Sequence, residues 1–118
     1  MLHRWYMQFC RRLSILILLG LFPLSVSAFF MDGHLLMEMM NAEKNPNTEL
    51  GFDAGVFNGY ITAIADVQGD VSWCPPNSVQ MNQISDIVSR YLLSHSENLH
   101  RPAVFLVMTA LEEVYPCR

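Results

Sequence analysis

The sequence has little charge, and after its first dozen positions it has few basic residues. Charged residues make up 15% of the 118 residues, with seven Lys and Arg against eleven Asp and Glu. Three of the basic residues, Arg4, Arg11 and Arg12, lie at the amino terminus. The length is enough for one domain and leaves no room for a separate catalytic module.

The amino terminus has the features of a secretory signal peptide. A basic stretch ends at Arg12, an apolar run follows, and Pro23 precedes a string of small residues that ends at Ala28. This pattern predicts cleavage after Ala28, so that 1–28 is the signal peptide and 29–118 is the exported domain.

An uncleaved anchor is the alternative, because the uncharged residues 13–31 are just long enough to cross a bilayer. In both cases Arg11 and Arg12 favour export of the remaining chain. We therefore expect a periplasmic protein that contacts the membrane only through its leader, and only if the leader is not cleaved.

The exported domain is acidic. It holds four basic and eleven acidic side chains, a formal net charge of −7. Such a surface repels phosphate backbones, and no basic stripe with interleaved aromatic residues is present, so nucleic-acid binding is not expected. A basic protein partner fits this charge better.

Cysteine usage predicts one disulfide. Cys10 lies in the leader, which leaves Cys74 and Cys117 as a pair in an exported domain. The alternative is two free thiols. By the chain-entropy model, closing a loop of this length would stabilise the fold by about 4 kcal/mol.

The spacing of apolar residues predicts an all-α fold, a compact four-helix bundle-like domain. Expected helices cover about 32–42 with Asp32 as the cap, 50–67, a third helix capped by Asn77 or Ser78, and a fourth that begins near Pro102. A turn is expected over 43–48. The expected apolar stripe of the third helix is Met81, Ile84, Ile87, Val88, Tyr91 and Leu92, and that of the fourth is Val104, Phe105, Met108, Leu111 and Val114.

The expected second helix carries Gly51, Gly55, Gly59 and Ala63 at intervals of four. Helical glycines are unfavourable, so we expect another helix to pack closely against this glycine row. A poorly formed helix and a dimer seam are the alternatives.

No residue pattern indicates catalysis, a metal or a cofactor. There is no G-x-S-x-G or comparable nucleophile motif, and Glu112 and Glu113 point in different directions on a helix. His34, His95 and His100 fit surface positions rather than a metal site with the cysteines. Methionines around His34 make Cu(I) binding conceivable, but core packing is the commoner use of methionine.

Several short motifs resemble the Rap/Tai family of type VI secretion immunity proteins. In chain order they are Gly59-Tyr60-Ile61 with Ile64 and Asp66, Cys74-Pro75, Gln83, Val88, Tyr91-Leu92, Pro102-Ala103, Ala110-Leu111 and Tyr115-Pro116-Cys117. The resemblance implies a periplasmic protein, commonly a homodimer, that binds and blocks a cell-wall amidase effector. Members commonly have a further cysteine pair, and the matching positions here are Met40 and Phe57.

An inhibitor of this kind fills a cleft of its partner. We therefore expect contacts from two loops and from the polar face of the third helix, namely Gln68, Asp70, Trp73, Gln80, Asn82, Ser85, His95, Glu97 and His100. Two other functions stay open at this point: a periplasmic acid-stress holdase chaperone, and an accessory protein of an envelope secretion or plasmid-transfer system.

Overall fold

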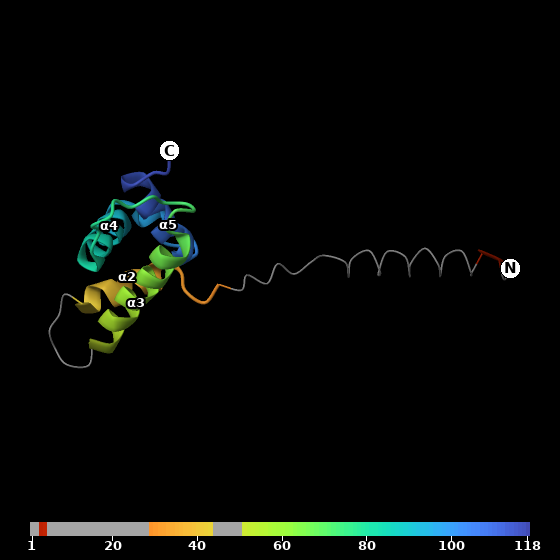
Figure 1. Ribbon diagram of the computed structural model, residues 1–118. Helices are drawn as coiled ribbons and strands as arrows, with labels where there is room; N and C mark the ends of the chain where they lie inside the picture. Colours follow the sequence, from red (N-terminus) through yellow and green to blue (C-terminus); the bar gives the residue numbers. More distant parts are fainter. Residues whose placement is uncertain (1–2, 5–28, 44–50) are drawn as a thin grey trace.

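The computed structural model describes residues 3–4, 29–43 and 51–118 (Figure 1). From residue 29 onward the described residues form the α-helices α2 (Gly33–Glu43), α3 (Gly51–Gln68), α4 (Met81–Ser94) and α5 (Ala103–Val114), with a short 3₁₀ helix at Ser96–Asn98. The prediction of an all-α, four-helix domain is confirmed. Within the described ranges, no helix has the length and apolar character needed to cross a bilayer. The expected signal peptide and the expected turn lie outside the described residues, apart from 3–4 and residue 43.

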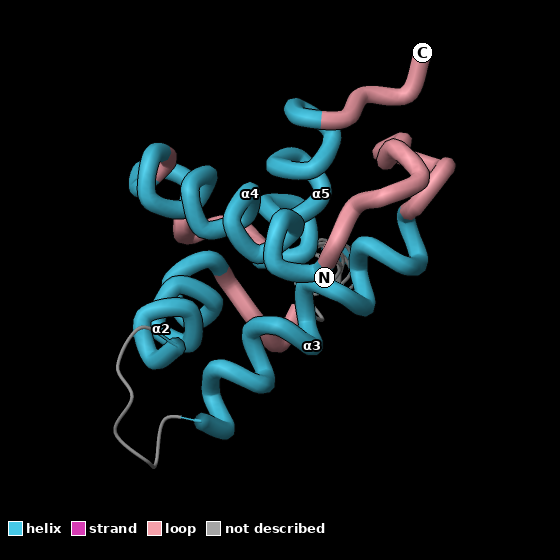
Figure 2. The backbone as a smooth tube through the Cα atoms, turned by 60° about the vertical axis from the view of Figure 1, so that its left-hand side comes forward, coloured by secondary structure: helices cyan, strands magenta, loops and turns pink. Residues whose placement is uncertain are grey.

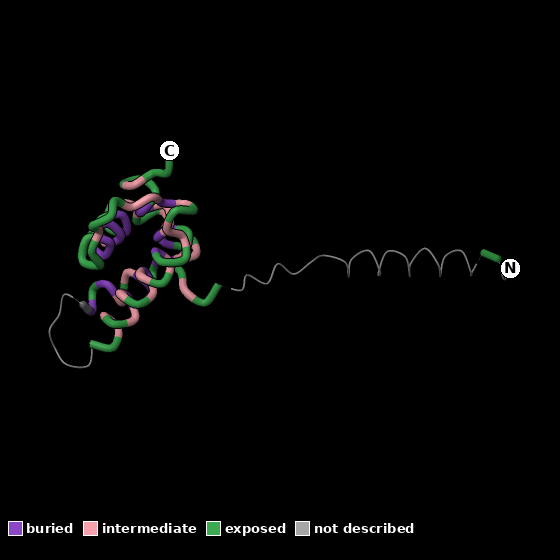
Figure 3. The backbone as a smooth tube through the Cα atoms, viewed as in Figure 1, coloured by how far each residue is buried: buried purple, intermediate pink, exposed green. Residues whose placement is uncertain are grey.

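The helices pack as two pairs around one core. α2 lies mainly against α3, and α4 lies mainly against α5, as Figures 1 and 2 show. Figure 3 shows that buried positions face the interior of the domain and exposed positions face outward. Met40 and Phe57 are both fully buried in this core. The core consists of Leu36, Met40, Phe57, Ile61, Ala65, Trp73, Ile84, Ile87, Val88, Tyr91, Leu92, Leu99, Ala103, Leu106, Val107, Ala110 and Leu111.

The start of α2 is fixed by its cap and by the segment before α5. Asp32 is the cap, as predicted, because its Oδ1 accepts a hydrogen bond of 2.9 Å from the backbone N–H of Leu35. The backbone N–H of Gly33 donates to the carbonyl of Arg101 at 3.0 Å, and that of His34 donates to the carbonyl of Leu99 at 3.1 Å. These bonds satisfy donors that the first turn of a helix leaves free.

Gly33 is the glycine that close packing requires. A Cβ at this position would lie 2.5 Å from Cδ1 of Leu106 and 2.8 Å from the backbone of Leu99. The glycine row of α3 is different, because a Cβ at Gly51, Gly55 or Gly59 would meet nothing within 4 Å. The expectation that another helix packs inside the domain on this row is therefore wrong.

The physical reason is the orientation of α3. Its buried residues are Phe57, Ile61 and Ala65, which lie on the opposite side of the helix from the glycines. The large apolar side chains determine which face is buried, and the glycine row is left on the surface.

The cap of α4 also differs from the prediction. Residues 77–78 form a turn, and Gln80 in extended conformation is the cap instead of Asn77 or Ser78. The backbone N–H of Gln80 donates to Oε1 of Gln83 at 2.8 Å. This is one half of a capping box, built here from two glutamines.

The apolar stripe of α4 is confirmed except at Met81, which is 54% exposed because it is the first residue of the helix, at the edge of the core. The stripe of α5 is wrong at Phe105 and Val114, which are 42% and 47% exposed. Leu111 is buried as predicted, and the other buried side chains of α5 are Ala103, Leu106, Val107 and Ala110. Residues 103–108 are all apolar, so the sequence offers two neighbouring stripes of the same spacing.

The predicted disulfide is confirmed. Cys74 and Cys117 are joined, with their Cα atoms 4.8 Å apart. The backbone N–H of Cys74 also donates to the carbonyl of Tyr115 at 2.8 Å. The loop before α4 is therefore tied to the end of α5 by a covalent bond and a hydrogen bond.

The difference between the closely packed Gly33 and the exposed Gly59 gives the first testable prediction. Gly59→Ala should raise the free energy of unfolding by about 1 kcal/mol, because alanine is the better helix former and its methyl group meets open space. Gly33→Ala should lower it by about 1–3 kcal/mol, because the methyl group clashes with backbone. Urea unfolding of the monomer, at a protein concentration too low for dimers to form, measures both, and a destabilised Gly59→Ala monomer would show that the row is packed within the domain.

The disulfide gives the second prediction. Replacing Cys74 and Cys117 together with serine should remove about 4 kcal/mol of stability, since the unfolded chain regains its loop entropy. Thermal unfolding measures the change. A reductant should lower the Tm of the wild type towards that of the variant and leave the variant unaffected. Equal Tm values under oxidising conditions would contradict the account.

Candidate functional site

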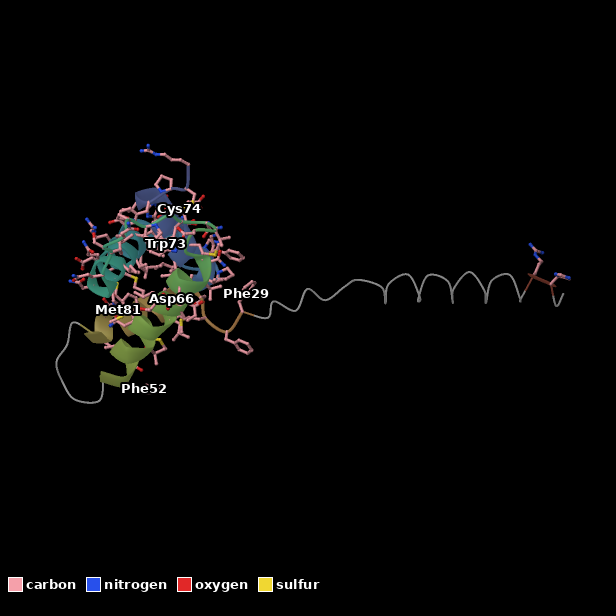
Figure 4. All side chains as sticks on the ribbon, viewed as in Figure 1. Phe29, Phe52, Asp66, Trp73, Cys74 and Met81 are labelled. Atoms are coloured by element: carbon pink, nitrogen blue, oxygen red, sulfur yellow. A yellow bond between two sulfur atoms is a disulfide. The ribbon has the colours of Figure 1, made fainter. Side chains whose placement is uncertain are left out.

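Trp73 holds the loop between α3 and α4 in place. The side chain is 3% exposed, and its Nε1–H donates a hydrogen bond of 3.0 Å to the carbonyl of Ala65 on α3. Its ring centroid lies 6.2 Å from that of Tyr115. Figure 4 shows Trp73 beside Cys74. Trp73 was predicted to contact a partner; in the structure its side chain is almost wholly buried, where it fixes the loop.

The loop forms a tight turn immediately after α3. The backbone N–H groups of Val71 and Ser72 donate to the carbonyl of Gln68, each at 3.0 Å, and that of Asp70 donates to the carbonyl of Trp73 at 2.9 Å. Asp70 has a φ of 60°, the left-handed region that Asp and Asn tolerate better than other non-glycine residues. Val71 is 73% exposed at this turn. The loop therefore presents a firmly held tip to solvent.

A cleft of about 390 Å³ opens between the end of α3 and this loop. We call it the Trp73 cleft. Its surface is mostly polar, with carboxylates from the end of α3 and from the turn, and apolar residues of the loop and the start of α4 add a smaller part. It is lined by Ala65, Asp66, Gly69, Asp70, Trp73, Pro75, Pro76, Asn77, Val79 and Ile84.

A second, larger hollow of about 570 Å³ runs along the outer side of α4. We call it the α4 groove, and it is lined by Asn58, Met81, Asn82, Ser85, Asp86, Ser89, Arg90 and Leu93. Ser85 Oγ donates to Asn58 Oδ1 at 2.7 Å, which links α4 to α3 at the base of the groove. Ser85 is 9% exposed and lies at the floor of the groove.

The predicted contact residues lie at two separate ends of α4. Gln68, Asp70, Gln80, Asn82 and Ser85 gather where α3 ends and α4 begins. The remaining ones, His95, Glu97 and His100, follow the end of α4. A helix of this length spans about 20 Å, so the structure does not bring the two loops together.

The His95 ring makes most of its contacts with the last turn of α4. Its ring stacks on Tyr91 with centroids 4.1 Å apart, and its Nδ1 lies 3.0 Å from the carbonyl of Tyr91. Burial raises the pKa of the Tyr91 phenol, and the nearby Glu113 carboxylate raises it further. Tyr91, His95 and Glu113 share a third hollow of about 370 Å³ between α4 and α5. We take the Trp73 cleft and the α4 groove as the candidate site; the groove begins at this end of α4, at Met81, and extends to Leu93 in the last turn.

The sequence prediction missed Asp66 and Asn58 as site residues. Asp66 lies four residues before Asp70, and the two carboxylates flank the end of a helix, a signal that the sequence contained. Asn58 gave no such signal, because only the packing of α3 against α4 brings it to Ser85. In the described part of the chain, no group of three or more His, Cys, Asp or Glu side chains is placed to hold a metal ion. The site offers amides, carboxylates and an apolar floor, which suit contact with a protein surface.

This structure is that of a small helical binding module, pinned at one end by a disulfide. The family model of the Rap1a immunity proteins matches residues 32–117, nearly all of the chain from residue 29 onward. The chain therefore belongs to the Rap1a immunity protein family, and it is an immunity protein whose partner is a protein effector. No curated protein matches the chain at a significant level.

The role of Trp73 gives the third prediction. Trp73→Phe should lower the free energy of unfolding by about 1–3 kcal/mol, because the carbonyl of Ala65 loses its donor inside the protein. Urea unfolding measures the loss, with Phe52→Leu as the control, since Phe52 is 78% exposed. Equal stability of the two variants would contradict a structural role for Trp73.

Proposed function

We propose that this chain is exported to the periplasm, where it binds and blocks a peptidoglycan amidase delivered by type VI secretion. The observation that carries the proposal is the match of residues 32–117 to the Rap1a immunity family. The amino-terminal sequence supports export, because a basic stretch, an apolar run and small residues come directly before the domain. A disulfide is also typical of an oxidising compartment.

The loop between α3 and α4 is the part of the site best suited to enter an enzyme cleft. Val71 projects from a turn whose neighbours are held by the disulfide, the Trp73 hydrogen bond and the backbone bonds to Gln68. A loop that is already ordered loses little entropy when it binds, so more of its contact energy appears as affinity. The acidic charge of the domain favours a basic surface on the amidase.

The proposal includes a homodimer, which the family resemblance suggests. The exposed glycine row of α3 is the surface that supports it, because glycine allows two helices to approach closely. In such a dimer the row would be a seam between copies, one of the alternatives that the sequence left open.

The acid-stress chaperone is the weaker alternative. Such a protein exposes apolar surface when buried or paired carboxylates become protonated. Ser85 is the one polar residue among the buried residues that the structure describes, so the described core depends on no carboxylate. This observation favours the immunity function over the chaperone.

The fourth prediction tests the proposed function directly. The exported protein, mixed at pH 7 with a panel of peptidoglycan amidases and other cell-wall hydrolases, should form a stoichiometric complex with one amidase and abolish its activity. Val71→Asp should weaken inhibition at least tenfold with no change in Tm, because Val71 is 73% exposed at the loop tip. Phe30→Asp is the matched control, since Phe30 is 99% exposed and precedes α2.

Two outcomes would contradict the proposal. The first is that no hydrolase is bound or inhibited at pH 7, while many unrelated denatured proteins are bound at pH 3, as a chaperone requires. The second is equal inhibition by wild type and Val71→Asp, which would exclude the loop tip from the contact.

A further inference from the structure

Two phenylalanines just before α2 lie on the surface beside a third from α5. Phe29 is 52% exposed and Phe30 is 99% exposed. The ring of Phe29 contacts that of Phe105 edge-on, with centroids 5.5 Å apart, and Phe105 is itself partly exposed. We call these three rings the aromatic patch. Exposed aromatic rings that lie together, rather than singly, indicate a contact surface.

The backbone holds the patch in place at the starts of α2 and α5. The N–H of Ala103 donates to the carbonyl of Met31 at 2.9 Å, and the N–H of Gly33 donates to the carbonyl of Arg101 at 3.0 Å. The side chain of Met31 packs against the core, whereas its neighbour Phe30 faces solvent. The patch is therefore part of the fold and does not belong to the candidate site, since none of its rings lines the Trp73 cleft or the α4 groove.

The sequence before the patch indicates what the patch meets. The uncharged run of residues 13–31, which is just long enough to cross a bilayer, includes Phe29 and Phe30. Asp32, the first charged residue after this run, is the cap of α2. The apolar run therefore continues into the folded domain, and the first side chains of the domain are of a kind that enters the boundary between lipid headgroups and acyl chains.

We propose that the aromatic patch docks the domain on the periplasmic surface of the inner membrane, with Phe30 inserted at the headgroup boundary and Phe29 and Phe105 beside it. This contact belongs to the folded domain and persists after the leader is cleaved. The proposal rests on the proposed function only for export, which sets the side of the membrane. The lipid contact itself is tested without an effector.

Docking through the patch sets the orientation of the domain. The patch lies at the start of α5, whereas Cys74 meets the end of α5, where its N–H donates to the carbonyl of Tyr115. A helix of 12 residues spans about 18 Å. Figure 4 likewise shows Phe29 away from Trp73 and Cys74. The Trp73 cleft and the turn at Val71 then face away from the membrane, towards the peptidoglycan on which an amidase acts.

The charges of the domain fit this orientation. Four exposed carboxylates lie far from the patch, at the end of α3, in the turn after it and near the end of α5: Asp66, Asp70, Glu112 and Glu113. An anionic bilayer repels these groups, so it disfavours contact through that end. The net charge of −7 also means that attraction between charges does not drive the docking. Apolar contact drives it, and high salt should not weaken it.

The first experiment measures binding of residues 29–118, which contain every residue of the core, to vesicles of phosphatidylethanolamine and phosphatidylglycerol by flotation. Half of the protein should be bound at roughly 1–5 mM lipid, which is weaker binding than a single myristoyl chain provides. Phe30→Ser should weaken binding at least threefold and leave the Tm unchanged, because this side chain makes almost no contact within the domain. Phe52→Ser is the matched control and should bind as the wild type does, since Phe52 is exposed at the start of α3, outside the patch.

The second experiment tests the orientation. Trp73 is the one tryptophan in residues 29–118, so it reports on the end of the domain that faces away from the membrane. Vesicles with brominated acyl chains should leave its fluorescence unchanged. In Phe30→Trp, the same vesicles should quench at least half of the emission that the introduced tryptophan adds.

The proposal would be overturned if the wild type bound no vesicles, if Phe30→Ser bound them equally well, or if Trp73 were quenched as strongly as the introduced tryptophan. Binding that disappears at 300 mM NaCl would also overturn it, because the contact would then depend on charge. Self-association without lipid that Phe30→Ser abolishes would assign the patch to a second copy of the chain instead. The proposed function is decided separately, by inhibition of an amidase in solution, so either proposal can fail while the other stands.

Discussion

The covalent bond between Cys74 and Cys117 holds together the end of the domain that carries the Trp73 cleft and the exposed turn at Val71. Without it, the loop after α3 and the last residues of the chain would be joined by a few hydrogen bonds and one pair of aromatic rings. With it, Trp73 is kept in position to bond to Ala65, and the end of α3, the start of α4 and the end of α5 become one unit. The Trp73 cleft and the exposed turn at Val71 are both parts of that unit.

This end of the molecule is rigid, although two of its residues have unfavourable local conformations or charges. Asp70 adopts a left-handed conformation, and Asp66 faces the negative end of its own helix. The disulfide supplies enough stability for the fold to tolerate both. An immunity protein that must recognise one effector gains from such an arrangement, because a fixed loop loses little entropy on binding.

The sequence predicted the helices, the Asp32 cap and the disulfide because each has a local signal: apolar spacing, a capping side chain before a helix, or a single pair of cysteines in a domain expected to be exported. It failed where the answer depended on packing between distant residues. The burial of Trp73 could not be read from the sequence, because it depends on a backbone carbonyl eight residues earlier on α3. The glycine row looked like a packing surface, but Phe57, Ile61 and Ala65 determine which face of α3 is buried. The two loops expected to form one site are separated by the length of α4.

The most direct test of the central claim is hydrogen–deuterium exchange of the protein alone and in complex with the hydrolase that it inhibits. The claim is that the disulfide-pinned end is the surface that meets the effector. The account predicts strong new protection over residues 66–82 and little change over residues 95–101, at the other end of α4. Protection confined to residues 95–101, with 66–82 unchanged, would contradict it.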